Sequence, residues 1–484
     1  MKGLKILLVI MAAALLTIGL SGVASAFHSG GVAECDGCHT MHNSWAEDGS
    51  FEAPMTDPVL PVGQTYAYLL QGPTQSDTCL ICHEHAGDTG PSSYHISTAS
   101  SDLGAGVPPK QRPPGGDFAW VKKDFSWYLR GSVTEHGERH GHNIVATSHG
   151  YVADIINTAA PGASGSTAYS GADLHCTSCH DPHGRYRRNA NGTITTTGLP
   201  IYASGSYNTS IDPSDGSGSV AGDAYAVGVY RFLGGVDYAP RSYQSVPFSA
   251  GPPAAIAPST YNRVETNTDT RVAYGSHMSE WCGNCHGKFV ENSYATGATG
   301  HTHPAGDSAL LSATAWLGPG NTISDNYNAY LGSGYLTGVS AGAFTSLVPF
   351  ETGSTVGDTS GHTVAIYDNL QLSTKSGIAG IANAGTTGSD RVMCLSCHRA
   401  HASGWLSMVR WPMEYEIMFV NATYPGTDAT APSNDAKYAK GRTVAETSAG
   451  FHNKPVTRFG ASVVASADGV ASQRSLCNKC HAKD

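Results

Sequence analysis

The sequence lacks several features that mark membrane proteins and nucleic-acid-binding proteins. After the first 26 residues, no segment of this 484-residue chain approaches the ~20 consecutive apolar residues of a membrane-spanning helix. Charged residues make up only 14% of the chain, Asp and Glu outnumber Lys and Arg by 38 to 28, and there is no basic stripe. We therefore expect a soluble mature protein with no transmembrane segment and no nucleic-acid partner.

Amphipathic segments at helical spacing are also few and short. The chain instead holds 58 Gly and 25 Pro, and stretches such as "NTAAPGASGSTAYSGAD" consist largely of small and polar residues. Such a chain buries little apolar surface to offset the conformational entropy lost on folding. Either part of it is disordered, or something other than its side chains supplies the core.

The N-terminus predicts export. Lys2 and Lys5 form a short basic start, residues 6–20 are apolar, and Ala24-Ser25-Ala26 is a small-x-small cleavage site. This pattern is typical of a secretory signal peptide over residues 1–26, with the mature chain beginning at Phe27. Residues 27–484 show no clear internal division, so we expect them to form a single domain.

All twelve cysteines lie in CxxCH motifs, the attachment sequence of c-type haem. A zinc ribbon uses CxxC pairs but needs no histidine directly after each. A thioredoxin-like CxxC occurs once, inside a βαβ unit, and a disulfide framework does not require such motifs. Six covalently bound haem c groups are therefore predicted, at Cys35/Cys38-His39, Cys79/Cys82-His83, Cys176/Cys179-His180, Cys282/Cys285-His286, Cys394/Cys397-His398 and Cys477/Cys480-His481.

The spacing within each motif has a chemical reason. Two thiols three residues apart can form thioethers with the two vinyl groups on one porphyrin edge, and the next residue then presents its imidazole to the iron. Six large apolar macrocycles would supply the missing core. We expect a mostly irregular fold with haems at its centre, short helices after the motifs and few short strands. The motifs begin 44, 97, 106, 112 and 83 residues apart and share no visible repeat beyond themselves.

The supply of histidine indicates bis-histidine ligation. Of 22 histidines, six follow the CxxC pairs and sixteen remain, more than the six needed as second ligands. Methionine is the alternative ligand, but the nine methionines bear no recurring relation to the motifs. Irons with two histidine ligands have no open position, which favours electron transfer over substrate binding.

Three motifs are followed by a histidine at the +3 position, His42, His183 and His401. If the chain is helical there, residues three apart share a face, so such a histidine would reach the iron of a neighbouring haem rather than its own. The alternative is a histidine that bonds a propionate or faces water. His85, at +2, is a weaker candidate.

Further candidate ligands lie away from the motifs, at His95, His142, His303 and His362. The other histidines are weaker candidates. Four lie beside a better candidate and are interpreted as spares: His136, His140, His149 and His301. His175 is sterically badly placed directly before Cys176, His277 and His452 have no local argument for ligation, and His28 would ligate only if the N-terminus is tied down. The basic cluster "RYRR", residues 185–188, either pairs with haem propionates or is a solvated loop.

Several segments resemble the extracellular hexahaem c-type cytochromes of metal-reducing bacteria of the OmcS type. They include "FHSGGVAECDGCHTMHNS", "HAGDTGPSSYHIST", "CTSCHDPHGRYRR", "RVAYGSHMSEWCGNCH", "CLSCHRAHASG" and "LCNKCHAKD". The similarity extends from the mature start to the C-terminus with all six motifs in order, and it weakens in the Gly/Ser-rich loops.

The resemblance implies bis-histidine ligation throughout and polymerisation into conductive extracellular filaments. In such filaments, the resemblance further implies, the haems pass electrons to other redox cytochromes and to external acceptors such as ferric minerals. It also implies that His42 ligates a haem of the adjacent subunit, that of the fifth motif, Cys394/Cys397-His398.

Two other functions stay open on the residues alone. A multihaem reductase needs an iron with an open position, often marked by an atypical motif such as CxxCK, whereas all six motifs here are uniform. A monomeric periplasmic or secreted electron shuttle has the same motif spacing as a filament subunit, and only the resemblance favours the filament. We expect the chain to be an electron carrier and not an enzyme. Only the reductase alternative would make it an enzyme.

Overall fold

The protein is described here from a computed structural model. The structure describes residues 37–39, 66–91, 94–163, 168–182, 187–188, 194–195, 201–202, 226–228, 233–235, 238–243, 246–252, 255–256, 273–274, 277–290, 303–313, 322–327, 348–351, 388–413, 424–430, 436–452, 477 and 480–481. The signal peptide over residues 1–26 lies outside these ranges, as do Cys35, His28, His42, His183, His301 and His362.

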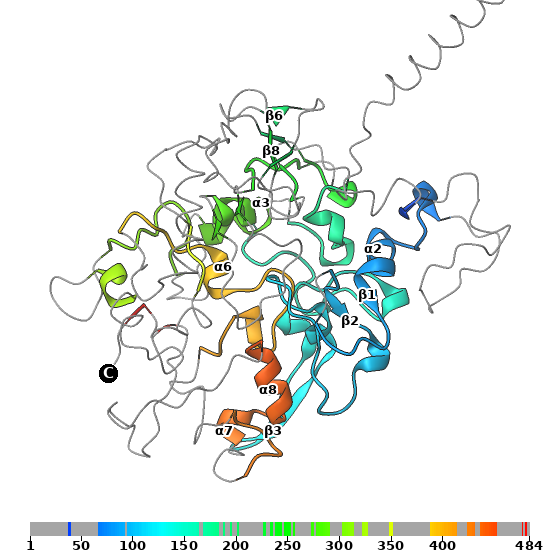
Figure 1. Cartoon of the computed structure of the whole chain (residues 1–484), viewed down its shortest axis with the longest axis vertical. Coiled ribbons are helices and arrows are strands. Elements are labelled where there is room, and N and C mark those ends of the chain that lie inside the picture. Colours follow the sequence, from blue (N-terminus) through cyan, green and yellow to red (C-terminus); the bar gives the residue numbers. More distant parts are fainter. Residues whose placement is uncertain are drawn as a thin grey trace, which may run out of the picture.

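Helices are short and scattered along the described chain (Figure 1). The α-helices are α2 (Gln75–His83), α3 (Met278–Val290), α6 (Cys394–Cys397), α7 (Ala436–Ala439) and α8 (Val444–Gly450). Short 3-10 helices are η3 (Ala67–Leu69), η4 (Ser100–Asp102), η5 (Phe118–Lys122), η6 (Gly137–His140), η7 (Thr147–His149), η8 (Gly171–Asp173), η9 (Cys176–Ser178), η12 (Arg241–Tyr243) and η16 (Leu406–Met408). Thr74 caps α2 and Thr443 caps α8, each by accepting a backbone N–H in the first turn.

The strands are shorter still and form small separate sheets. They are β1 (Glu84–His85), β2 (Ser97–Thr98), β3 (Phe125–Tyr128), β4 (Ser132–Glu135), β5 (Arg187–Arg188), β6 (Ile194–Thr195), β7 (Ile201–Tyr202), β8 (Ala226–Gly228), β9 (Ala255–Ile256) and β10 (Ala273–Tyr274). β1 pairs with β2 in parallel, β3 with β4 and β9 with β10 antiparallel, and the remaining four lie in the order β6-β5-β8-β7.

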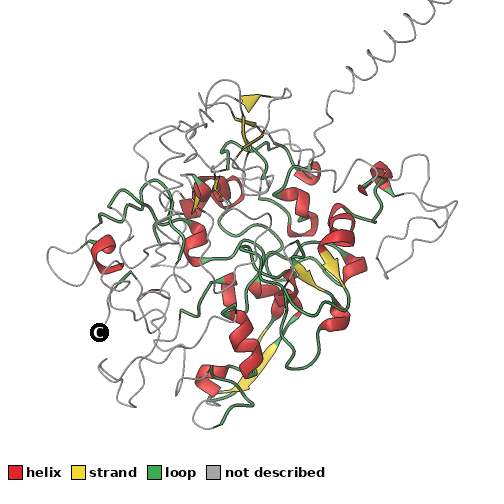
Figure 2. Ribbon diagram, in the orientation of Figure 1, coloured by secondary structure: helices red, strands yellow, loops and turns green. Residues whose placement is uncertain are grey.

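The expected fold class is confirmed, because loops dominate and join short helices and strands (Figure 2). The expected position of the helices is wrong. α2 ends at the second motif's histidine, α6 ends one residue before the fifth motif's histidine, and extended backbone follows both. Helices therefore carry the CxxC pairs, and the chain leaves them directly afterwards; α3, which continues to Val290, breaks helical geometry at His286.

Apolar clusters in the described residues are small, and three of them contact motif cysteines. The first contacts Cys179 and Cys282 and consists of Leu233, Met278, Met393 and Leu395. The second contacts Cys176 and consists of Leu80, Phe118, Ile144, Ala146 and Tyr151. The third contacts Cys480 and consists of Ala309, Leu311, Ile323 and Val392.

These four cysteines were predicted only as haem attachment points, and the structure shows that they also pack against the core. The sequence missed this second role because the residues of each cluster come from distant segments of the chain. Cys480 is the clearest case: its cluster consists of Ala309, Leu311, Ile323 and Val392, and its own carbonyl oxygen accepts a hydrogen bond from the side-chain amide of Asn326 at 3.4 Å. Contact between small apolar clusters and the attachment cysteines agrees with the expectation that haem completes the core.

A long-range pairing brings together two segments that carry candidate ligands. The bridge between Gly141 and Ala402 places residues 140–143 alongside residues 401–403, and the N–H of His142 donates to the carbonyl oxygen of His401 at 2.9 Å. In Figure 1, α6 lies between α3 and α8, which places the fifth motif near the middle of the described chain.

Among the described residues, no helix is both long and apolar enough to cross a membrane.

Candidate haem sites

Four motif histidines are held by the same hydrogen bond. Their Nδ1 atoms lie 2.7–2.9 Å from backbone carbonyl oxygens: His39 at Tyr68, His83 at Tyr94, His286 at Pro161 and His398 at Ser407. A histidine that donates Nδ1–H to a carbonyl presents its Nε2 lone pair, which is how metal-ligating histidines are commonly oriented. These residues therefore fit an iron ligand.

Three pairs of rings are spaced as two ligands of one iron would be. With metal–nitrogen bonds of about 2 Å, two imidazoles on opposite sides of a metal have ring centres about 6 Å apart. The ring centres of His142 and His286 lie 6.0 Å apart, those of His180 and His401 6.4 Å, and those of His303 and His481 6.0 Å. Each pair joins one motif histidine to one candidate from the sequence.

The three partner rings are anchored like the motif histidines. His142 Nδ1 lies 2.7 Å from the carbonyl oxygen of Ala400, His303 Nδ1 2.8 Å from that of Pro304, and His401 Nδ1 3.2 Å from that of Gly116. His401 follows extended backbone at His398, so the helical premise of the +3 argument is wrong at this motif. Its ring nevertheless faces a histidine of another motif rather than His398.

His95 is placed differently. Its ring stacks on His85, with centres 5.8 Å apart and planes within 5°, and neither residue directly follows a CxxC pair. Its Nδ1 lies 2.6 Å from a carboxylate oxygen of Asp88 rather than a carbonyl. This contact does not assign His95 to a motif.

Several of the weaker candidate histidines have structural partners. Both ring nitrogens of the buried His140 are engaged, Nδ1 with the carbonyl of Trp120 at 3.1 Å and Nε2 with Glu135 at 2.8 Å. His149 contacts Glu84, and His175 contacts the carbonyl of Val145. His140 is thereby excluded as a ligand in this arrangement.

Burial disfavours the charged form of four of the candidate ligands. Burial lowers the pKa of His286 to about 4, and burial likewise lowers the pKa of His142, His398 and His481. A neutral imidazole is the form that binds a metal. The charge state of these residues thus suits ligation at neutral pH.

The motif cysteines form one continuous series in sequence order. The Cys79 thiol hydrogen-bonds to Cys176, and this bond together with burial and the nearby Cys38 raises the pKa of Cys79. Burial and then Cys285 raise the pKa of Cys179 to about 12. The remaining two links are the hydrogen bond of Cys282 to Cys394 and the interaction of Cys397 with Cys477. Each of the six motifs therefore lies beside the next.

The sixth motif ends this series. The N–H groups of Cys480 and His481 both donate to the carbonyl oxygen of Cys477, at 3.2 and 2.9 Å, which closes the motif into a tight turn. Cys480 lies on the side of the turn that meets the apolar cluster around Leu311. The ring of His481 lies beside His303. The turn thus presents a cysteine and a histidine to the same region, as haem attachment requires.

Two junctions in the series are built alike. Ser76, three residues before Cys79, accepts a hydrogen bond from the N–H of Cys176 at 3.1 Å. Ser279, three residues before Cys282, accepts one from the N–H of Cys394 at 3.1 Å. The third and fifth motifs also share an internal serine, Ser178 and Ser396, which bonds back to the N–H of the residue before the motif.

These serines were missed in the sequence. The signal was present as S-x-x-C before the second and fourth motifs and C-x-S-C in the third and fifth. The eleven described cysteines are all free of disulfides, which agrees with their use as haem attachment points.

Comparisons with known proteins agree with this geometry. The chain is 48% identical over 494 residues to the C-type cytochrome OmcS of Geobacter sulfurreducens, with all of both chains covered. It also matches a structure described as OmcS nanowires from that organism, with a TM-score of 0.72, 47% identity, and coverage of 94% of this chain and all of the other. A second, the Outer Membrane Cytochrome S Filament, gives a TM-score of 0.70 at 46% identity, covering 94% of this chain and all of that one. No protein-family model matches.

Proposed function

The chain belongs to the family of the C-type cytochrome OmcS, and we propose that it carries electrons along six haem c groups as a subunit of an extracellular filament. It is an electron carrier and not an enzyme. The observation that supports this most is the series of hydrogen bonds and electrostatic interactions between cysteines that links the six motifs in sequence order.

Each haem supplies a one-electron ferric–ferrous couple. The cysteines tether each macrocycle at a fixed place in the series, and the carbonyl-anchored histidines present Nε2 to the iron. Because cysteines of successive motifs hydrogen-bond or interact electrostatically, the groups they carry are held near one another. No side chain in this arrangement has to bind a substrate.

Three second ligands are proposed from the ring pairs. His142 serves the fourth motif with His286, His401 the third with His180, and His303 the sixth with His481. His95, His183 and His362 remain the candidates for the first and second motifs.

His42 is proposed to ligate the haem of the fifth motif in the adjacent subunit. Its position three residues beyond His39 supports this, as does the filament form of the relatives of known structure. A shared ligand would make assembly and coordination one event. The signal peptide over residues 1–26 accounts for export, and other redox cytochromes and extracellular acceptors such as ferric minerals are the proposed partners.

The ligand assignments can be tested with one substitution and a matched control. In His142→Ala, five haems should remain low-spin and one should become high-spin or bind added imidazole, as seen by electron paramagnetic resonance. His136→Ala, which removes a half-exposed histidine bonded to Asp124, should leave all six low-spin. Six low-spin haems in His142→Ala would contradict the assignment.

The filament can be tested separately by electron microscopy of the secreted protein. His42→Ala should keep six covalent haems but fail to polymerise. A monomeric shuttle is the alternative, and it predicts no filaments from the unmodified protein either.

A further inference from the structure

His95 has an unusual partner among the predicted ligands. Its Nδ1 lies 2.6 Å from Oδ2 of Asp88, and the two side chains are only 6% and 16% exposed. By contrast, the Nδ1 atoms of seven other predicted ligands bond to backbone carbonyl oxygens, at His39, His83, His142, His286, His303, His398 and His401.

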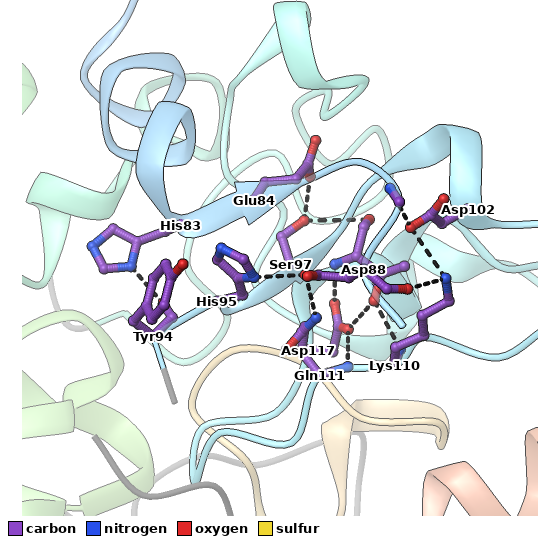
Figure 3. Close-up of polar contacts among 12 residues, drawn as sticks. His83, Glu84, Asp88, Tyr94, His95, Ser97, Asp102, Lys110, Gln111 and Asp117 are labelled. Atoms are coloured by element: carbon purple, nitrogen blue, oxygen red, sulfur yellow. Dashed lines mark hydrogen bonds and ion pairs between the residues drawn. The ribbon is translucent and has the colours of Figure 1, made fainter. Parts of the chain in front are cut away.

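Asp88 is itself held in place (Figure 3). Gln111 donates its amide N–H to the same Oδ2 at 2.8 Å, and Lys110 donates to the backbone carbonyl of Asp88 at 2.6 Å. Lys110 also pairs with Asp102, which in turn accepts the N–H of Gly87. The carboxylate is therefore fixed against the ring and screened little by water.

A buried carboxylate on Nδ1–H makes the imidazole a stronger donor than a neutral carbonyl does, because it draws the ring towards imidazolate. A stronger donor stabilises ferric iron more than ferrous iron. We propose that Asp88 is a positioning residue that lowers the reduction potential of the haem ligated by His95, relative to haems whose ligands bond to carbonyls. The proposal rests on the proposed function, in that His95 must be an iron ligand.

The consequence for the protein is an uneven series of potentials. The haem that His95 ligates would stay oxidised when its neighbours are reduced, and so would form a step in the chain of electron transfer. Nothing about the motif itself predicts this, because all six CxxCH sequences are alike.

The test uses the fully haemed protein and potentiometric titration followed by absorbance. Asp88→Asn keeps the side-chain shape but removes the charge, and one of the six midpoint potentials should rise by about 59 mV, a tenfold change in that haem's oxidised-to-reduced ratio. Asp88→Glu should restore most of the original value. Gln111→Met should shift the same haem in the opposite direction, because it removes the donor that competes for Oδ2.

Asp102→Asn is the matched control, since it removes an equal charge from the same network without touching a histidine. In Asp102→Asn, the midpoint potential of the same haem should shift by no more than a third of its shift in Asp88→Asn. Equal shifts in the two variants, or unchanged potentials in Asp88→Asn, would overturn the proposal. His95→Ala tests the premise that His95 is an iron ligand. Loss of one low-spin haem supports this premise. Six low-spin haems overturn the proposal while leaving the filament function intact.

Discussion

Arg442 is expected to be the most sensitive structural residue near the paired histidines. It is fully buried, forms an ion pair with the buried Glu135, and donates Nε–H to the carbonyl of Gly404 at 3.0 Å. Its guanidinium lies 4.0 Å from the ring of Phe125. Glu135 also holds His140, which lies in the segment that pairs with residues 401–403.

Arg442→Met would leave the Glu135 carboxylate buried without its main countercharge. Removing one partner of a buried ion pair costs about 3–5 kcal/mol, and we expect the free energy of unfolding to fall by that amount at pH 7. The pKa of Glu135 reflects its whole environment: burial raises it, but the hydrogen bond from His140 and the charge of Arg442 together outweigh burial and lower it to about 2 from 4.5. A lowering of this size corresponds to about 3 kcal/mol.

The sign of the pH dependence follows. Since the pKa is lower in the folded protein, this stabilisation is complete above about pH 4.5 and is lost as the pH falls towards 2. The difference between the unmodified protein and Arg442→Met should therefore shrink in acid.

The assay is guanidinium unfolding followed by far-ultraviolet circular dichroism, at pH 7 and pH 3. The double variant Glu135→Gln/Arg442→Met, which removes the stranded charge, should be more stable than Arg442→Met alone at pH 7. The reasoning is refuted if Arg442→Met costs less than about 1 kcal/mol, the range of an exposed pair, or if the double variant gains nothing.

Three further predictions concern a buried carboxyl group, a constrained glycine and a candidate ligand. Glu351 is fully buried, and burial raises its pKa to about 8, so its contribution to stability should fall as the pH rises from 4.5 to 8. Glu351→Gln should reduce the loss of unfolding free energy between pH 5 and pH 9. An unchanged loss in that variant would count against this prediction. Gly116 has φ +85° and a Cβ there would meet the carbonyl oxygen of Ala402 at 1.8 Å, so Gly116→Ala should cost more than about 1 kcal/mol. Gly90→Ala, with open space around it, should cost under about 1 kcal/mol in the same assay. His303→Ala should convert one haem in six to high-spin while leaving the other five unchanged.

The attachment chemistry could be predicted from the sequence because it is local. Two cysteines and a histidine within five residues define one haem site wherever they occur, and the composition already indicated that the core had to come from the haems. The loop-rich fold followed from the same reasoning. The helices were misplaced because the CxxC turn itself is helical, and the chain turns away immediately after it at His83 and His398.

The pairing of ligands could not be predicted from the sequence. His142 and His286 are far apart in the chain, and only the three-dimensional path of the loops brings them together. The packing of Cys480 against Leu311 and Val392 could not be predicted for the same reason. Ser76 and Ser279 share the spacing S-x-x-C before their motifs, but the sequence does not show that each accepts a hydrogen bond from the first cysteine of the next motif.

Electron cryo-microscopy of the assembled filament tests the central claim most directly. The account predicts six haems per subunit in an unbroken series that follows the order of the motifs, with His142 and His286 bonded to one iron and the series continued into the next subunit. A haem out of sequence order, or two successive haems separated by a layer of protein, would contradict it.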